Sequence, residues 1–281
     1  MGQLALAAKV THVPSMFLSE RDGPHKGCRR GAIEGLAELG RRLKASACDT
    51  VVVLDTHWLV NSGYHLNACE SFSGVFTSNE FPHFIQNLEY RYQGNPALGD
   101  AIAELATRNG VHTRAHHVRT LDVEYGMLVP LRYMRADPSL KVVSVAAWCA
   151  FASMEESRTV GAAIAQAIAQ SGNRVALLAS GSLSHRIHDN DVVESGGLTI
   201  SDEFYRQVDL RALELWEQGR FREFTAMLPT YAKACYGEGW MHDTAMLLGA
   251  LGWDRYEQRV EILTPYFASS GTGQVNAVFP V

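Results

Sequence analysis

Residues 51–58 (VVVLDTHW) constrain the fold more than any other stretch of the chain. The apolar, mostly β-branched run at residues 50–54 is too short for a helix and shows no polar alternation. Such a run is typical of a strand buried on both faces inside a parallel sheet. The strand ends abruptly on Asp55, Thr56 and His57. Since ligands of open α/β sheets bind at the carboxyl ends of the strands, His57 is predicted to reach a functional edge, although a histidine that only caps a strand end is an alternative.

Two further apolar segments end on histidines in the same way. Residues 4–10 run into Thr11-His12-Val13-Pro14, where the proline must end the strand, and residues 175–179 run into a loop that ends at His185. Three histidines at strand ends are a stronger indication of a site than one. The loop is not a nucleophile elbow, because His185 stands where the G-x-S-x-G pattern needs its second glycine, so a serine hydrolase is disfavoured.

Helical patterns separate the predicted strands. Residues 28–47 are amphipathic, residues 96–109 begin with proline and end before a glycine, and Ser153-x-x-Glu156 is a capping box. Ser201 is expected to cap a later helix, and the aromatic residues 72–84 are expected to form a loop that walls a pocket or covers a sheet edge. The pattern predicts one catalytic α/β domain over residues 1–281. Its central, mostly parallel mixed sheet is flanked by helices, with the active site at the strand C-terminal ends.

Composition excludes several classes of function. The 281 residues carry a net charge of −5 and no broad basic field, which argues against nucleic acid as a partner. Five scattered cysteines without a C-x-x-C pair favour a reducing cytoplasm over a disulfide framework. No apolar run approaches the ~20 residues of a membrane span, so no membrane partner is expected. The N-terminal residues fit a first strand better than a signal peptide.

A carboxylate between two glycines, Gly237-Glu238-Gly239, is the fourth candidate. The glycines let a ligand or the backbone come close, although an acidic residue before a helix is also favoured by the helix dipole. Together, His12, His57 and Glu238 match the two-histidine, one-carboxylate triad of non-haem Fe(II) enzymes, and zinc accepts the same donors. These residues alone do not distinguish an Fe(II) site from a zinc site.

These motifs resemble those of the class III extradiol catechol dioxygenases, and the likeness extends to the SSGTGQVNAVFP tail. The resemblance implies that His12, His57 and Glu238 bind Fe(II), with Mn(II) or Zn(II) as other occupants, and that His185 is the acid–base residue. Many relatives carry a His-Gly pair where this chain has Tyr125-Gly126. Tyr125 is therefore expected to bond the substrate or an oxygen species in place of a second acid–base histidine.

The implied reaction inserts both atoms of O₂ into a catechol. The ring is cleaved beside the two hydroxyl groups rather than between them, which gives a muconic semialdehyde. If the catechol carries an acidic side chain, two groups are candidates to bind its carboxylate. One is the turn at residues 270–273, with Ser270 and Thr272, and the other is Arg132, which can form a bidentate pair. Sheet edges and aromatic loops predict a homo-oligomer. The alternatives are a zinc or dinuclear-metal hydrolase and a Memo-type, non-catalytic binding protein.

Overall fold

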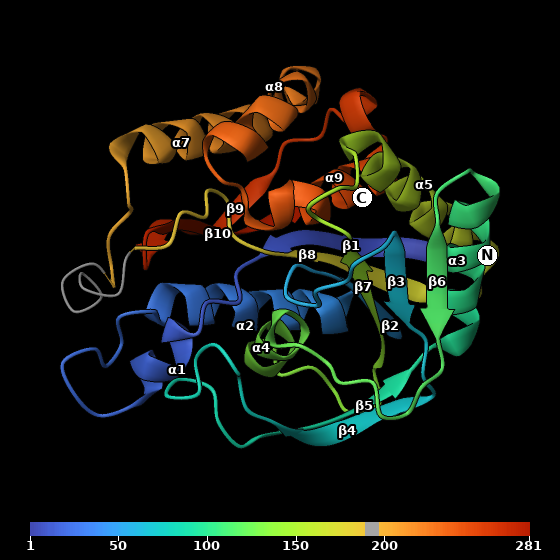
Figure 1. The fold of residues 1–281 in the computed structure, drawn as a ribbon, viewed down its shortest axis with the longest axis horizontal. Helices are drawn as coiled ribbons and strands as arrows, with labels where there is room; N and C mark the ends of the chain where they lie inside the picture. Colours follow the sequence, from blue (N-terminus) through green and yellow to red (C-terminus); the bar gives the residue numbers. More distant parts are fainter. Residues whose placement is uncertain (189–196) are drawn as a thin grey trace.

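The computed structural model describes residues 1–188 and 197–281, whose strands form one mixed sheet (Figure 1). The strands are β1 (Gln3–Val10), β2 (Thr50–Asp55), β3 (Tyr64–Asn67), β4 (Ser71–Phe76), β5 (Leu88–Gly94), β6 (Thr113–His116), β7 (Lys141–Ala147), β8 (Arg174–Ser180), β9 (Glu261–Ser269) and β10 (Thr272–Phe279). The helices are α1 (Ser15–Glu20), α2 (Arg30–Ala45), α3 (Pro96–Arg108), α4 (Tyr125–Tyr133), α5 (Met154–Gln170), α7 (Glu203–Glu217), α8 (Phe221–Ala234) and α9 (His242–Leu251), with short 3₁₀ turns η2 (Glu238–Met241) and η3 (Trp253–Arg255).

The sheet is parallel in the middle and has antiparallel pairs at both edges, β4 with β5 at one and β10 with β9 at the other. Its order is β4-β5-β7-β2-β8-β1-β10-β9, and β7, β2, β8 and β1 run parallel to one another. β10 and β9 are antiparallel additions beside β1, while the short strands β3 and β6 branch from β7. The predicted α/β fold with a mostly parallel mixed sheet flanked by helices is confirmed.

Side chains of the central strands alternate between two apolar cores. In β2, Val51 and Val53 pack with α2 and α4, whereas Val52 and Leu54 pack on the other face with α3, α5 and α9. All six residues of β2 are buried, as the continuous apolar run predicted. Figure 1 shows α2 and α4 on one side of the sheet, α5 and α9 on the other, and the α7–α8 pair farther out. Within the described residues, no helix is long and apolar enough to cross a membrane.

The register of the three central strands brings their ends together. Ser180 at the end of β8 pairs with Val10 of β1 on one side and with Asp55 of β2 on the other. The residues that follow these strands therefore leave the sheet at one edge, side by side. His12, His57 and the loop that leads to His185 consequently start from the same place, as the strand-end pattern predicted.

One local expectation was wrong, and a second holds only in part. Asp202, rather than Ser201, is the N-cap residue of α7: its carboxylate accepts the backbone N–H of Phe204, while the Ser201 hydroxyl donates to the Gly271 carbonyl. Residues 72–76 of the expected aromatic loop belong to β4, which pairs with β5 and forms one edge of the sheet, whereas residues 77–84 lie in the connecting loop and Glu80 there lines a cavity. Each of these two strands has only one buried residue, so neither carries the apolar run by which the buried strands were recognised.

Candidate metal centre and active site

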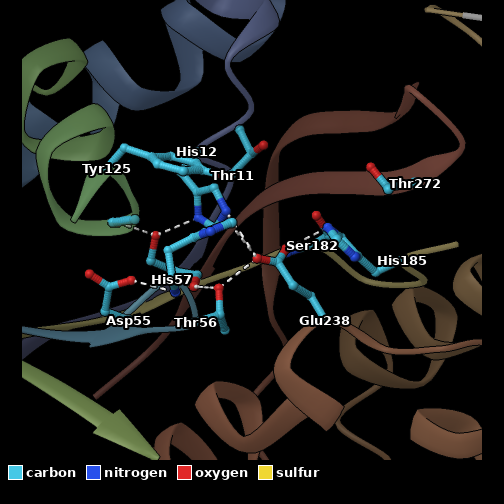
Figure 2. Close-up of polar contacts among 12 residues, drawn as sticks. Thr11, His12, Asp55, Thr56, His57, Tyr125, Ser182, His185, Glu238 and Thr272 are labelled. Atoms are coloured by element: carbon cyan, nitrogen blue, oxygen red, sulfur yellow. Dashed lines mark hydrogen bonds and ion pairs between the residues drawn. The ribbon is translucent and has the colours of Figure 1, made fainter. Parts of the chain in front are cut away.

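His12, His57 and Glu238 converge on one point at this edge of the sheet (Figure 2). The Nε2 atom of His12 lies 3.0 Å from Glu238 Oε1, and the Nε2 atom of His57 lies 3.2 Å from the same oxygen. One ligand atom from each of the three residues lies within 4.8 Å of the others. The two imidazole rings are nearly perpendicular, with centroids 4.7 Å apart. This is the donor spacing that a single small cation requires.

Hydrogen bonds fix His12 with its Nε2 atom toward this point. The Ser180 hydroxyl donates to the Gly126 carbonyl at 2.5 Å. Its oxygen therefore accepts the hydrogen bond from the N–H of His12 Nδ1, at 2.9 Å. Because Nδ1 donates to Ser180, Nε2 is the nitrogen that faces the cluster, and it can bind a metal when it carries no proton. His57 is held through its backbone, whose N–H donates to the Asp55 carboxylate at 2.8 Å.

Glu238 is buried, and each carboxylate oxygen has its own donor. The Thr56 hydroxyl donates to Oε1 at 2.6 Å, and the Ser182 backbone N–H donates to Oε2 at 2.5 Å. Burial by itself raises the pKa of Glu238, but the charges of His12 and His185 and the histidine hydrogen bonds outweigh it and hold that pKa well below 4.5. The carboxylate is thus ionised over the working range of an enzyme.

A left-handed turn delivers Glu238 to the site. Gly239, Trp240 and Met241 all have φ between 50° and 58° with ψ between 26° and 30°. For residues other than glycine this conformation costs roughly 1–2 kcal/mol each. A side chain on Gly239 would touch Thr56 and Cys149 at 3.0 and 3.2 Å, so the turn also lies close against the strand ends. Unfavourable backbone of this kind persists only where the surroundings hold it.

His185 faces the same point from the other side of Glu238 (Figure 2). Its Nε2 lies 3.7 Å from Glu238 Oε2, and about a quarter of its side chain is exposed. Burial lowers the pKa of His185 below 6.5, with Glu238 opposing the effect and the positive forms of His57 and His12 adding to it. The imidazole is therefore neutral at neutral pH and able to accept a proton.

The loop that carries His185 is tied to the outer helices by a buried carboxylate. Asp209 in α7 accepts the backbone N–H of Ser184 at 3.1 Å and the Ser184 hydroxyl at 2.7 Å. The hydroxyls of Tyr231 and Tyr266 donate to it as well, at 2.6 and 3.0 Å. Because it is buried, the pKa of Asp209 is raised from 3.8 to about 6. These contacts fix the backbone immediately before His185.

The ring of Tyr125 packs against the ring of His57, one of the three candidate ligands. Its ring centroid is 3.9 Å from that of His57, and its hydroxyl donates to Glu80 Oε2 at 3.1 Å. Burial raises the pKa of the phenol, and Glu80 and Glu238 raise it further, so the hydroxyl keeps its proton. Glu80 comes from the loop between β4 and β5, and no motif in the sequence pointed to it.

A cavity of about 440 Å³ opens beside the cluster. Its lining includes His57, Glu80, Glu238, His185 and Tyr236, with Leu59, Trp148, Cys149 and Trp240 among the other lining side chains. Among the described residues, the lining contains no lysine or arginine. The space suits a flat, partly apolar ring presented to the three candidate ligands.

The predicted substrate-binding residues do not line this cavity. Arg132 forms a bidentate pair with Glu20 at 2.9 and 3.0 Å. The N–H groups of Ser270 and Gly271 donate to backbone carbonyls, and the Thr272 hydroxyl donates to a carbonyl at 2.7 Å while its backbone pairs with His185. These contacts give no support to the anion-binding role of Arg132, Ser270 and Thr272, which stays a prediction.

Comparison with known proteins gives a match over nearly the whole chain. Residues 6–280 match the family model described as the catalytic LigB subunit of aromatic ring-opening dioxygenase. The chain is 52% identical to 3,4-dihydroxyphenylacetate 2,3-dioxygenase from Escherichia coli over 270 residues, covering 96% of this chain and 98% of that protein. It is 26% identical to the 2-aminophenol 1,6-dioxygenase beta subunit from a Pseudomonas species, covering 86% of this chain and 85% of that one.

A solved structure shares the fold at lower sequence identity. The crystal structure of an uncharacterised protein from Escherichia coli K12 superposes with a TM-score of 0.67 and 16% identity, covering 98% of this chain and 99% of that one. At this identity the likeness supports the fold alone.

Proposed function

This chain belongs to the LigB family of aromatic ring-opening dioxygenases and is an extradiol ring-cleaving enzyme, and from that premise we propose that its substrate is 3,4-dihydroxyphenylacetate. The product would be a muconic semialdehyde formed in aromatic catabolism. The observation that carries the proposal is the cluster of His12, His57 and Glu238, which opens on a cavity with His185 at its wall. Family membership favours this reaction over the hydrolase and the Memo-type binding protein.

Fe(II) is the metal that we propose for the cluster. Two imidazoles and one ionised carboxylate on one side of a point are the donor set of non-haem Fe(II) oxygenases, and the orientation of His12 fits it. His12, His57 and Glu238 would hold the ion. When bound, Fe(II) supplies a Lewis acid for the two catechol oxygens and a source of electrons for O₂. Mn(II) and Zn(II) accept the same donors, and metal analysis separates the three.

His185 is proposed to move the proton of a catechol hydroxyl. Its neutral imidazole lines the cavity 3.7 Å from Glu238, so a hydroxyl held at the triad lies within its reach. The lowered pKa supports the role, because a protonated histidine could not accept the proton. After accepting it, the same ring can return the proton to the oxygen of the opened product.

Tyr125 is proposed to act as a hydrogen-bond donor beside His57. The raised pKa of its phenol supports a donor that stays protonated and disfavours a general base. In the described structure that proton is directed to Glu80, a half-exposed residue on a loop. A modest movement of Glu80 would release the phenol toward a substrate or oxygen atom.

Oxygen uptake tests the proposed function directly. The Fe(II)-loaded protein should consume one O₂ per catechol and form a yellow product, with the highest kcat/KM for 3,4-dihydroxyphenylacetate in a panel that includes 3,4-dihydroxybenzoate, 4-methylcatechol and catechol. Preference for an uncharged catechol would overturn the substrate assignment. No O₂ uptake with any of the four would overturn the function.

We also propose a cytoplasmic homo-oligomer. All five cysteines are free, which supports a reducing compartment. The edge strand β4 presents an exposed Val75, and such an edge can pair with a second copy. Light scattering coupled to gel filtration measures the number of subunits, and a monomer at micromolar concentration would contradict this part of the proposal.

A further inference from the structure

A buried ion pair lies beneath the candidate metal centre and takes no part in the proposed reaction. The ammonium of Lys9 contacts Asp243 Oδ2, and both side chains are inaccessible, at 0% and 1% exposure. Lys9 belongs to β1, three residues before His12, and Asp243 belongs to α9, five residues after Glu238. The pair therefore links the strand that delivers one candidate ligand to the turn that delivers another.

The pair also lies directly under the donors that hold Glu238. A side chain on Gly181 would be 2.8 Å from Asp243 Oδ2, 3.2 Å from Lys9 Nζ and 3.1 Å from the Thr56 methyl group. The next residue after Gly181 supplies the N–H that Glu238 accepts, and Thr56 supplies the hydroxyl. The ion pair and Thr56 therefore both lie close against Gly181, the residue before the Ser182 donor.

The chain between Glu238 and Asp243 needs such an anchor. Gly239, Trp240 and Met241 are all left-handed, and backbone in this region is retained only where contacts on both sides hold it. Thr56 and Ser182 hold the turn at its first residue, and the Lys9–Asp243 pair holds it at its far end. A buried ion pair adds little stability over a well-packed apolar pair, so stability is a weak reason for the chain to contain one.

We propose that Lys9 and Asp243 are positioning residues that set the spacing between His12 and Glu238, and hence the affinity of the site for its metal. The inference rests on the proposed metal role of these two residues. The Lys9–Asp243 contact would thus influence the metal centre, although neither side chain touches the metal or the substrate. Residues that orient metal ligands in this way typically change metal affinity by about 10–100-fold when they are removed.

The test compares single and double substitutions. Lys9→Met leaves Asp243 unpaired and Asp243→Asn leaves Lys9 unpaired, so each single variant should lose both thermal stability and metal affinity. The double variant Lys9→Met/Asp243→Asn removes both charges and should regain a Tm close to that of the wild type. Its Fe(II) affinity, measured by anaerobic calorimetric titration of the metal-free protein, should stay at least tenfold weaker.

Two results would overturn the positioning role. One is a double variant that binds Fe(II) as tightly as the wild type, and the other is a double variant that does not fold, since the pair would then serve stability alone. Arg42→Met/Glu261→Gln, at a partly exposed pair, is the matched control and should leave Fe(II) affinity unchanged. The titration needs no substrate, so a wild type that binds Fe(II) but opens no catechol would refute the proposed function and leave this inference standing.

Discussion

Removing the Thr56 hydroxyl should weaken metal binding without disturbing the fold. That hydroxyl lies 2.6 Å from Glu238 Oε1 and 3.1 Å from the Ser180 carbonyl oxygen. Thr56→Val keeps the shape of the side chain and removes the donor. The carboxylate then loses one of the two donors that hold it toward His12 and His57, and Oε1 becomes free to rotate away from the cluster.

The size of the effect follows from the type of hydrogen bond. A hydrogen bond to a charged group contributes about 1.5–3 kcal/mol. At about 1.4 kcal/mol per factor of ten, that range corresponds to a loss of roughly 10–150-fold in affinity. Measured effects of residues that orient metal ligands, about 10–100-fold, fall in the same range.

Anaerobic titration of the metal-free protein with Fe(II) measures this loss. Thr225→Val is the matched control, because Thr225 is also buried but its hydroxyl donates to a carbonyl within α8. We expect the control to bind Fe(II) like the wild type and Thr56→Val to bind it at least tenfold more weakly. Binding by Thr56→Val within twofold of the wild type would refute the reasoning that Glu238 depends on this donor.

Two further outcomes are expected. His185→Phe should retain Fe(II) but lose about 10²–10⁴-fold in kcat, and full turnover would remove His185 from its acid–base role. Because the pKa of Asp209 is raised from 3.8 to about 6 in the folded protein, it contributes stability at low pH that is lost as the pH rises through 6. Relative to Asp209→Asn, the wild type should lose about 1 kcal/mol of unfolding free energy between pH 5 and pH 7, and a flat difference in denaturant titrations would contradict this.

Strand ends made the centre of the site predictable from the sequence. The buried runs before His12, His57 and His185 are recognisable because apolar residues fill both faces of a parallel strand, and the fold then brings their ends together. Glu238 was found by its flanking glycines. Only Gly239 has the positive φ that favours glycine, and the two residues after it adopt the same conformation without being glycine.

The contacts that the sequence did not indicate are long-range pairings of ordinary residues. Arg132 was predicted to bind a carboxylate, and it does, but the carboxylate is that of Glu20, 112 residues away. Lys9 is the next-to-last residue of an apolar strand, and its partner is 234 residues distant. Glu80 reaches the cavity from a hairpin whose half-exposed strands carry no strong apolar pattern. Such pairings depend on the packing of the whole chain, so no local pattern reveals them.

Anomalous diffraction from crystals loaded with Fe(II) under anaerobic conditions tests the central claim most directly. The iron should lie at about 2.0–2.2 Å, the usual metal–ligand distance, from His12 Nε2, His57 Nε2 and one Glu238 oxygen. Iron bound elsewhere, or any of these three atoms more than about 3 Å from it, would contradict the proposed centre.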